Sequence, residues 1–258
     1  MKLNAMNYNK IAELLDKAAY NAKACEQISA HTTFDLNAAY AIQSISMSRR
    51  YIRGEKLTGL KLGFTSRAKM EQMGVHDMIW GRLTDSMHYA SGADLKKDKF
   101  IHPRVEPEIA FLVSEKIEKE LTLENVKEYV HSVAVAIEVI DSRYENFKFS
   151  LEDVVADNCS SSGFVLGEWK PVGTNIQNIP IQININKALA HDGNSNAILG
   201  NPWESMVAIS RLAVDNGEIL KKGSIVLAGA ATPASYVNQG DSILASAEGL
   251  GNVSLQVI

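Results

Sequence analysis

Two carboxylates stand two positions apart in residues 104–111 (RVEPEIAF). In a β-strand, residues i and i+2 point to the same face, so Glu106 and Glu108 are expected to project side by side. Pro107 between them favours a strand edge or a strand start. Two carboxylates this close repel each other unless one takes a proton or a cation lies between them. Taken alone, the motif is also compatible with a solvated pair at a strand edge.

A third carboxylate interrupts an apolar segment. Residues 133–140 (VAVAIEVI) read as a strand buried on both faces, broken only by Glu138. An unpaired carboxylate there costs several kcal/mol, so Glu138 needs a partner. The partner is either a cation such as Arg143 or Arg104, or a metal ion shared with the first two carboxylates. Three carboxylates suit Mg²⁺ or Mn²⁺ better than zinc, and the two features together favour the metal.

A single lysine stands among apolar residues and glycines in residues 59–66 (GLKLGFTS). The glycines let a ligand approach the backbone closely, and apolar neighbours lower the pKa of a lysine such as Lys61, which suits proton transfer. A strand lysine reaching solvent is the alternative. Polar residues at 141–144 and 153–162 follow apolar segments and either orient ligands or cap helices and form turns.

Other catalytic patterns are missing from the sequence. The six histidines form no HxH or HExxH motif, and there is no GxSxG, P-loop or GxGxxG motif. Cys159 reads as a packed thiol, and with Cys25 far away in the chain a disulfide framework is not expected.

The elements that must position these groups change in character along the chain. We expect a small helical N-terminal region (1–90), with short strands around its glycines, and a β-rich metal-binding catalytic body (91–258), forming one compact α+β unit. Ser150 and Asp153 predict a capping box, and Thr33 or Asp35 is the candidate cap of the helix over 35–52. The periodicity predicts helices over 11–22, 35–52, 123–131, 151–157 and 204–216, and strands over 109–113, 181–185, 224–229 and 252–258.

The composition is that of a globular protein. The chain has 258 residues, of which 46% are hydrophobic and 22% charged. A net charge of -4 argues against a nucleic-acid partner. No apolar stretch reaches the length needed to span a membrane, and the N-terminus lacks the apolar core of a secretory signal. A cytoplasmic location is therefore expected.

Four motifs together resemble the fumarylacetoacetate-hydrolase-fold family, and within it the hydratase and decarboxylase branch of the catechol meta-cleavage pathway. The resemblance covers nearly the whole chain. It implies a mixed β-rich body with flanking helices, and Mg²⁺ or Mn²⁺ held by Glu106, Glu108 and Glu138. The motifs are GLKLGFTS (59–66), PRVEPEI (103–109), EVIDSR (138–143) and VADN (155–158).

Two features separate the activities within the branch. Its hydratases tend to carry an acidic residue two positions before the glycine that is Gly81 here, where this chain has Ile79. The residues after Arg143 also resemble those of decarboxylases. We therefore expect a lyase that removes CO₂ from a 2-oxo dicarboxylic acid, a 2-oxo-3-enedioate. Three alternatives stay open: a hydratase, an acylpyruvate hydrolase using His31, and a metal-holding subunit that stabilises a hydratase.

The resemblance also implies roles for individual residues. Lys61, Ser161 and Arg143 are the expected catalytic residues, and Leu62, Gly63, Ile79, Asp157 and Thr232 the expected substrate-binding residues. Arg67, Lys69 and Lys148 are candidates for the distal carboxylate of the substrate. A homo-oligomer is expected, as is a complex with a hydratase or decarboxylase partner.

Overall fold

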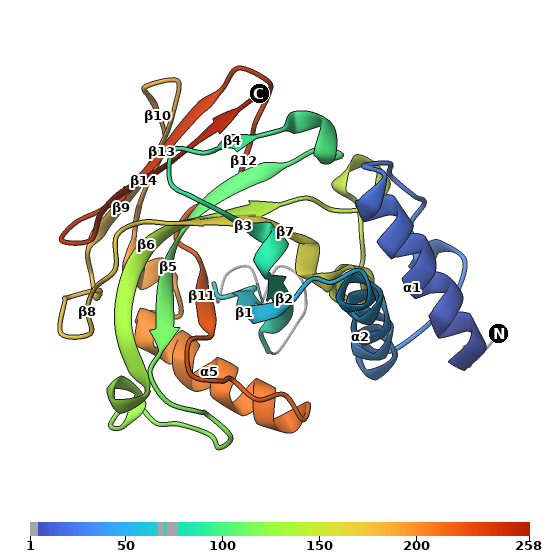
Figure 1. Cartoon of the computed structure of the whole chain (residues 1–258), viewed down its shortest axis with the longest axis horizontal. Coiled ribbons are helices and arrows are strands. Elements are labelled where there is room, and N and C mark those ends of the chain that lie inside the picture. The colour runs from blue at the N-terminus through green and yellow to red at the C-terminus, as the bar shows by residue number, and fades with distance from the viewer. Residues whose placement is uncertain (1–4, 67–69, 71–76) are drawn as a thin grey trace.

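The computed structural model describes residues 5–66, 70 and 77–258, which form two β-sheets with helices at the periphery (Figure 1). In Figure 1 the helices of the N-terminal part lie to the right, and the smaller sheet lies at the upper left. The described α-helices are α1 (Ala5–Tyr20), α2 (Leu36–Ile52), α4 (Leu151–Ala156) and α5 (Pro202–Asp215).

The larger sheet has nine strands. Its main path runs β2 (Ile79–Thr84), β1 (Leu57–Gly63), β11 (Ile225–Ala230), β5 (Arg104–Val113), β6 (Val130–Ile140), β7 (Ser161–Leu166) and β3 (His88–Tyr89). Two short strands attach to this path, with β12 (Ser235–Tyr236) pairing with β5 and β8 (Lys170–Pro171) pairing with β6. The long antiparallel pair β5–β6 is therefore central.

The smaller sheet has five strands and covers one face of β5–β6. Its order is β10 (Ala188–Asn194), β9 (Pro180–Ile185), β13 (Ser242–Ala247), β14 (Gly251–Val257) and β4 (Asp94–Leu95). Ile109 and Ile137, on one face of β5–β6, share a hydrophobic core with Ile183 of β9. The opposite face carries Ala110 and packs in a second core with Met47 of α2. Because side chains alternate along a strand, Glu106 and Glu108 lie on this second face.

The local signals for helices are confirmed where a cap is present. The side chain of Asp35 accepts a hydrogen bond from the backbone N–H of Ala38 at 2.8 Å and begins α2. Ser150 and Asp153 form the expected capping box at the start of α4. These contacts satisfy backbone N–H groups that have no partner within the helix.

One expectation about the elements differs from the structure. The helix predicted over 123–131 is only a short 3₁₀ turn, Val126–Tyr129, after which β6 begins at Val130. The β-branched residues that follow favour the strand, and its pairing with β5 outweighs the weak helical pattern. Strands from both the 1–90 and the 91–258 regions lie in the larger sheet, since β1, β2 and β3 belong to the same sheet as β5 and β6. Among the described residues, no helix is long and apolar enough to cross a membrane.

Candidate active site

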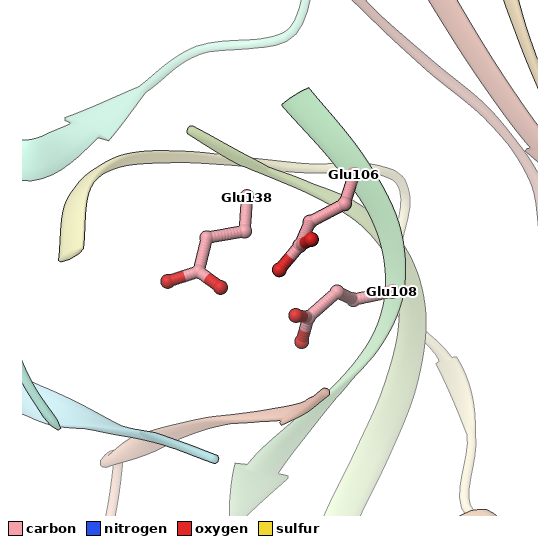
Figure 2. A group of neighbouring side chains, drawn as sticks. All are labelled: Glu106, Glu108 and Glu138. Carbon is pink, nitrogen blue, oxygen red and sulfur yellow. The ribbon is translucent and has the colours of Figure 1, made fainter. Parts of the chain in front are cut away.

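Three glutamates meet on the second face of β5–β6. Glu106 pairs directly with Glu138 across the two antiparallel strands, and Glu108 lies one side-chain repeat further along β5. Figure 2 shows their carboxylates pointing toward one another. All three residues are buried, and one oxygen from each lies within 4.8 Å of the others. The strand register thus produces the cluster that the sequence predicted.

The cluster has the chemistry of a divalent metal site. Glu108 Oε2 accepts a hydrogen bond from the backbone N–H of Gly229 at 2.7 Å, whereas its Oε1 is buried with no hydrogen-bond partner among the described residues. Burial, with the charges of Glu138 and Glu106, raises the pKa of Glu108 well above its ordinary value. A cation bound between the carboxylates would relieve both the repulsion and the unmet acceptor. Three oxygen donors of this kind fit Mg²⁺ or Mn²⁺.

Lys61 is the ion-pair partner of Glu138, for which the sequence suggested Arg143 or Arg104. Its Nζ lies 3.1 Å from Glu138 Oε1 and 3.2 Å from Oε2, and both side chains are buried. Burial alone would lower the pKa of Lys61, but Glu138 and the neighbouring carboxylates raise it above its ordinary value. The expectation of a lowered pKa is therefore wrong for these described residues, because it considered only the apolar neighbours in sequence. Lys61 is an ammonium donor at the edge of the cluster.

A cavity of about 390 Å³ opens beside Lys61 and Glu106. Leu62, Gly63 and Ile79, all expected to contact substrate, lie in its wall, and Gly63 pairs with Ile79 between β1 and β2. The cavity is large enough for a small organic acid, and most of its wall is apolar. The described lining residues are 61–66, Ile79, Arg104, Glu106, Ile140, Phe147, Phe149, Val154, Cys159, Ser160, Ala230, Pro233 and Ala234.

An unusual turn forms one wall of the cavity. Asn158, Cys159 and Ser160 have φ angles of 50°, 51° and 58°, a left-handed conformation that is costly for residues other than glycine. The turn is anchored by Asn158, whose side chain exchanges two hydrogen bonds with the backbone of Arg82 on β2, at 2.7 and 2.9 Å. Such strain persists only where surrounding contacts hold it, and here it brings Cys159 and Ser160 into the cavity wall.

Arg143 and Asp157 hold this turn through buried contacts. The two form a buried ion pair, and the Arg143 guanidinium also donates to the carbonyl oxygens of Asp157 at 2.6 Å and Ser161 at 3.2 Å. Neither Arg143 nor Asp157 is among the described residues that line the cavity. These contacts favour a positioning role for both residues. Their expected contact with substrate stays a prediction.

Ser161 contacts the carboxylate cluster, whereas Thr232 lies in a loop beside the cavity. Ser161 is buried on β7, and its hydroxyl donates to Glu138 Oε1 at 3.4 Å, so it contacts the carboxylate cluster directly. The Thr232 hydroxyl donates to the carbonyl of Pro233 at 3.1 Å, and the neighbouring Pro233 lines the cavity. Thr232 therefore shapes the loop beside the cavity. Its contact with substrate stays a prediction.

Several groups in the cavity wall were missed from the sequence. Arg104 lines the cavity, although it was considered only as a salt-bridge partner, and its position two residues before Glu106 was the available signal. The Ser160 hydroxyl is buried without a hydrogen-bond partner among the described residues, and only the local backbone turns it to the cavity. Cys159 is a packed thiol as expected, since its Sγ donates to the Trp80 carbonyl at 3.1 Å and burial raises its pKa to about 12.

The remaining candidates from the sequence lie elsewhere. Arg67 and Lys69 fall outside the described residues, and Lys148 is exposed and is not among the described residues of the cavity wall. The imidazole of His31 is exposed and pairs with Glu26 at 3.0 Å. His31 is also absent from the described lining, so the geometry gives no support to the hydrolase alternative.

A solved structure shares the fold of this chain over its whole length. A 4-oxalocrotonate decarboxylase from Pseudomonas putida G7, solved with magnesium and adipate, aligns with a TM-score of 0.95 and 32% identity, covering 100% of this chain and 99% of that one. A fumarylpyruvate hydrolase from Pseudomonas aeruginosa, solved with Mn²⁺ and pyruvate, aligns with a TM-score of 0.59 and 17% identity, covering 77% of this chain and 88% of that one. The second likeness concerns the fold alone.

Sequence comparison agrees with the structural match. A 4-oxalocrotonate decarboxylase from Pseudomonas sp. is 44% identical over 96% of this chain and 97% of its own length. A 2-keto-4-pentenoate hydratase from Dechloromonas aromatica is 34% identical over 85% of each chain. The family model for the fumarylacetoacetate (FAA) hydrolase C-terminal region matches residues 66–258. The chain therefore belongs to the fumarylacetoacetate hydrolase family.

Proposed function

We propose that this chain is a lyase that uses Mg²⁺ or Mn²⁺ to decarboxylate 2-oxohex-3-enedioate (4-oxalocrotonate) to 2-hydroxypenta-2,4-dienoate and CO₂. The observation that carries the proposal is the near-full-length similarity to 4-oxalocrotonate decarboxylases, at 44% identity in one case and a TM-score of 0.95 in another. Hydratases match at lower identity and over less of the chain. The carboxylate cluster beside the cavity supplies the physical support.

The reaction needs a group that accepts electrons at the end opposite to the carboxylate that leaves. When the bond to CO₂ breaks, its electron pair moves through the alkene to the 2-oxo oxygen. A divalent ion held by Glu106, Glu108 and Glu138 would supply Lewis-acid stabilisation of the negative charge there. No general base is needed to start the reaction, because the leaving group is CO₂.

The residues of the chain then hold the substrate and the proton. The Lys61 ammonium, at the edge of the cavity, donates hydrogen bonds to the 2-oxo acid end and holds a proton for the enol oxygen of the product. The Ser161 hydroxyl fixes one oxygen of Glu138. Gly63 lets Ile79 pack closely against β1 in the cavity wall, because a Cβ there would meet Ile79 Cγ1 at 3.0 Å.

Apolar wall residues separate this reaction from hydration. Ile79 is buried in the wall, where related hydratases tend to carry an acidic residue, and Phe64, Phe149 and Val154 add further apolar surface. These apolar side chains cannot themselves activate water, and they limit the access of water to the product. The site therefore favours release of the dienol over its hydration.

The experiment is a mass balance on the purified protein with Mg²⁺ and, in parallel, with EDTA. One reaction receives 2-oxohex-3-enedioate and the other 2-hydroxypenta-2,4-dienoate. We expect metal-dependent CO₂ release from the first and no hydration of the second. Glu106→Gln should abolish CO₂ release, whereas Glu168→Gln, at an exposed carboxylate, should not. Hydration without CO₂ release would make the protein a hydratase, and silence in both would favour the non-catalytic subunit.

We also propose that the chain forms a homo-oligomer and binds the hydratase that consumes its product. We place the protein in the cytoplasm as part of the same proposal. A dienol released into solution tautomerises, so direct transfer to a hydratase would protect it. Size-exclusion chromatography of this chain, alone and mixed with a hydratase of the same branch, tests both assemblies. Separate elution of the two proteins at micromolar concentration would contradict the complex.

A further inference from the structure

We infer that Arg104 binds the distal carboxylate of the substrate and thereby selects dicarboxylates over monocarboxylates. The inference rests on the proposed function, which leaves that end of the substrate without a partner. Among the described residues of the cavity wall, only Lys61, Arg104 and Glu106 are charged. Lys61 is paired with Glu138, so Arg104 is the cation in this wall that remains for a second carboxylate.

The strand places Arg104 at the correct end of the cavity. Arg104, Glu106 and Glu108 occupy alternate positions on β5 and therefore project from one face. Arg104 pairs with Ile140 across β6, one repeat beyond the Glu106–Glu138 pair, and Ile140 also lines the cavity. Two residues along a strand correspond to about 7 Å, a separation that a six-carbon dicarboxylate can span from the glutamate cluster.

The side chain of Arg104 is built to receive an anion. Its guanidinium carbon lies 3.8 Å from the ring centre of Phe147 and 4.0 Å from that of Tyr236, so aromatic rings cover the guanidinium. One terminal nitrogen donates to the Tyr236 hydroxyl. The Nε is buried with no hydrogen-bond partner among the described residues, and no carboxylate of that part of the chain lies within 4 Å of the guanidinium. A guanidinium with unused donors can bind a carboxylate in a bidentate pair.

A tight ion pair to the carboxylate that leaves would also stabilise the ground state, because that charge disappears when CO₂ forms. Loss of Arg104 should therefore weaken binding without slowing the chemical step. In Arg104→Gln, the KM for 2-oxohex-3-enedioate should rise roughly 10- to 100-fold, as expected for a charge-assisted hydrogen-bonded pair. The kcat should stay the same or rise, because the contact stabilises the bound substrate at least as strongly as the transition state.

The decisive experiment measures binding without turnover. Calorimetry on the Mg²⁺-loaded protein compares 2-oxohexanedioate with 2-oxohexanoate, which share the 2-oxo acid end and differ in the distal carboxylate. The wild type should bind the dicarboxylate roughly 10- to 100-fold more tightly. In Arg104→Gln this preference should nearly vanish, with the affinity for 2-oxohexanoate unchanged. Arg104→Lys keeps the positive charge but loses the planar guanidinium, so it should retain part of the preference for the dicarboxylate. This variant replaces Arg104→Gln in the experiment if Arg104→Gln does not fold.

Lys148→Gln is the matched control, because it removes an exposed cation next to Phe147 that does not line the described cavity. It should keep the full preference for the dicarboxylate. Two results would overturn the role of Arg104 and leave the proposed function standing. One is equal affinity of the wild type for the two acids, and the other is an equal loss of affinity for both acids in Arg104→Gln. Binding of neither acid by the wild type would instead contradict the proposed function.

Discussion

Replacing Lys61 by methionine tests whether the buried ion pair and the metal share Glu138. The Lys61 ammonium lies 3.1 and 3.2 Å from the two oxygens of Glu138, and both side chains are buried. Methionine keeps most of the aliphatic stem and removes the charge. Loss of one partner from a buried pair costs about 3–5 kcal/mol, because the other must stay uncompensated or take a proton.

The stability of the metal-free protein should therefore fall markedly. At about 2–4 °C per kcal/mol for a domain of this size, the melting temperature in EDTA should fall by roughly 6–20 °C. Mg²⁺ should restore much of this loss, because the ion neutralises Glu138 and no longer has a neighbouring ammonium to repel it. The increase in melting temperature caused by Mg²⁺ should thus be larger in Lys61→Met than in the wild type.

Thermal unfolding of four proteins, each with EDTA and with Mg²⁺, measures the effect. Lys170→Met is the matched control, since Lys170 pairs with Glu168 at 2.7 Å on the surface and should contribute at most about 1 kcal/mol. The double variant Lys61→Met, Glu138→Gln should recover much of the loss seen in EDTA, because the uncompensated charge is gone. An unchanged stability of Lys61→Met in EDTA, or an equal effect of Mg²⁺ on both proteins, would refute the reasoning. Full decarboxylase activity in Lys61→Ala would contradict the proton-holding role.

Three further predictions concern the site and its supports. In Gly81→Ala the new Cβ would meet the carbonyl oxygen of Asn158 at 2.6 Å, so chemical denaturation should show a loss of about 1–3 kcal/mol, whereas Gly173→Ala, with no atom within 4 Å, should be nearly neutral. Glu108→Gln should weaken binding of Mg²⁺ by at least about tenfold in calorimetry, and unchanged affinity would remove Glu108 from the ligand set. Burial outweighs the attraction of its ion pair and raises the pKa of Asp157 from 3.8 to about 6, so the folded state holds the extra proton between these values. As the pH rises from about 4 to 6, the wild type should therefore lose roughly 3 kcal/mol of stability relative to Asp157→Asn, and a constant difference would contradict the raised pKa.

Features that depend on neighbouring residues can be read from the amino-acid sequence. The two-residue period of a strand placed Glu106 and Glu108 on one face, and the apolar surroundings of Glu138 showed that this carboxylate needed a partner. The caps at Asp35 and Ser150 were also readable, because a cap involves only a few adjacent residues. Where the local signal was weak, as over 123–131, the prediction failed because pairing of the following strand decided the structure.

Which of these groups meet depends on how segments far apart in the chain pack together. The register of β5 against β6 sets Glu138 opposite Glu106, and the order of strands brings Lys61 of β1 to the same cluster. The direction of the pKa shift of Lys61 follows from that meeting, so apolar sequence neighbours predicted it wrongly. Likewise, the rings that cover Arg104 come from segments distant in the chain. Register, stacking and the field at a buried charge arise from contacts between residues far apart in sequence, and no local pattern encodes them.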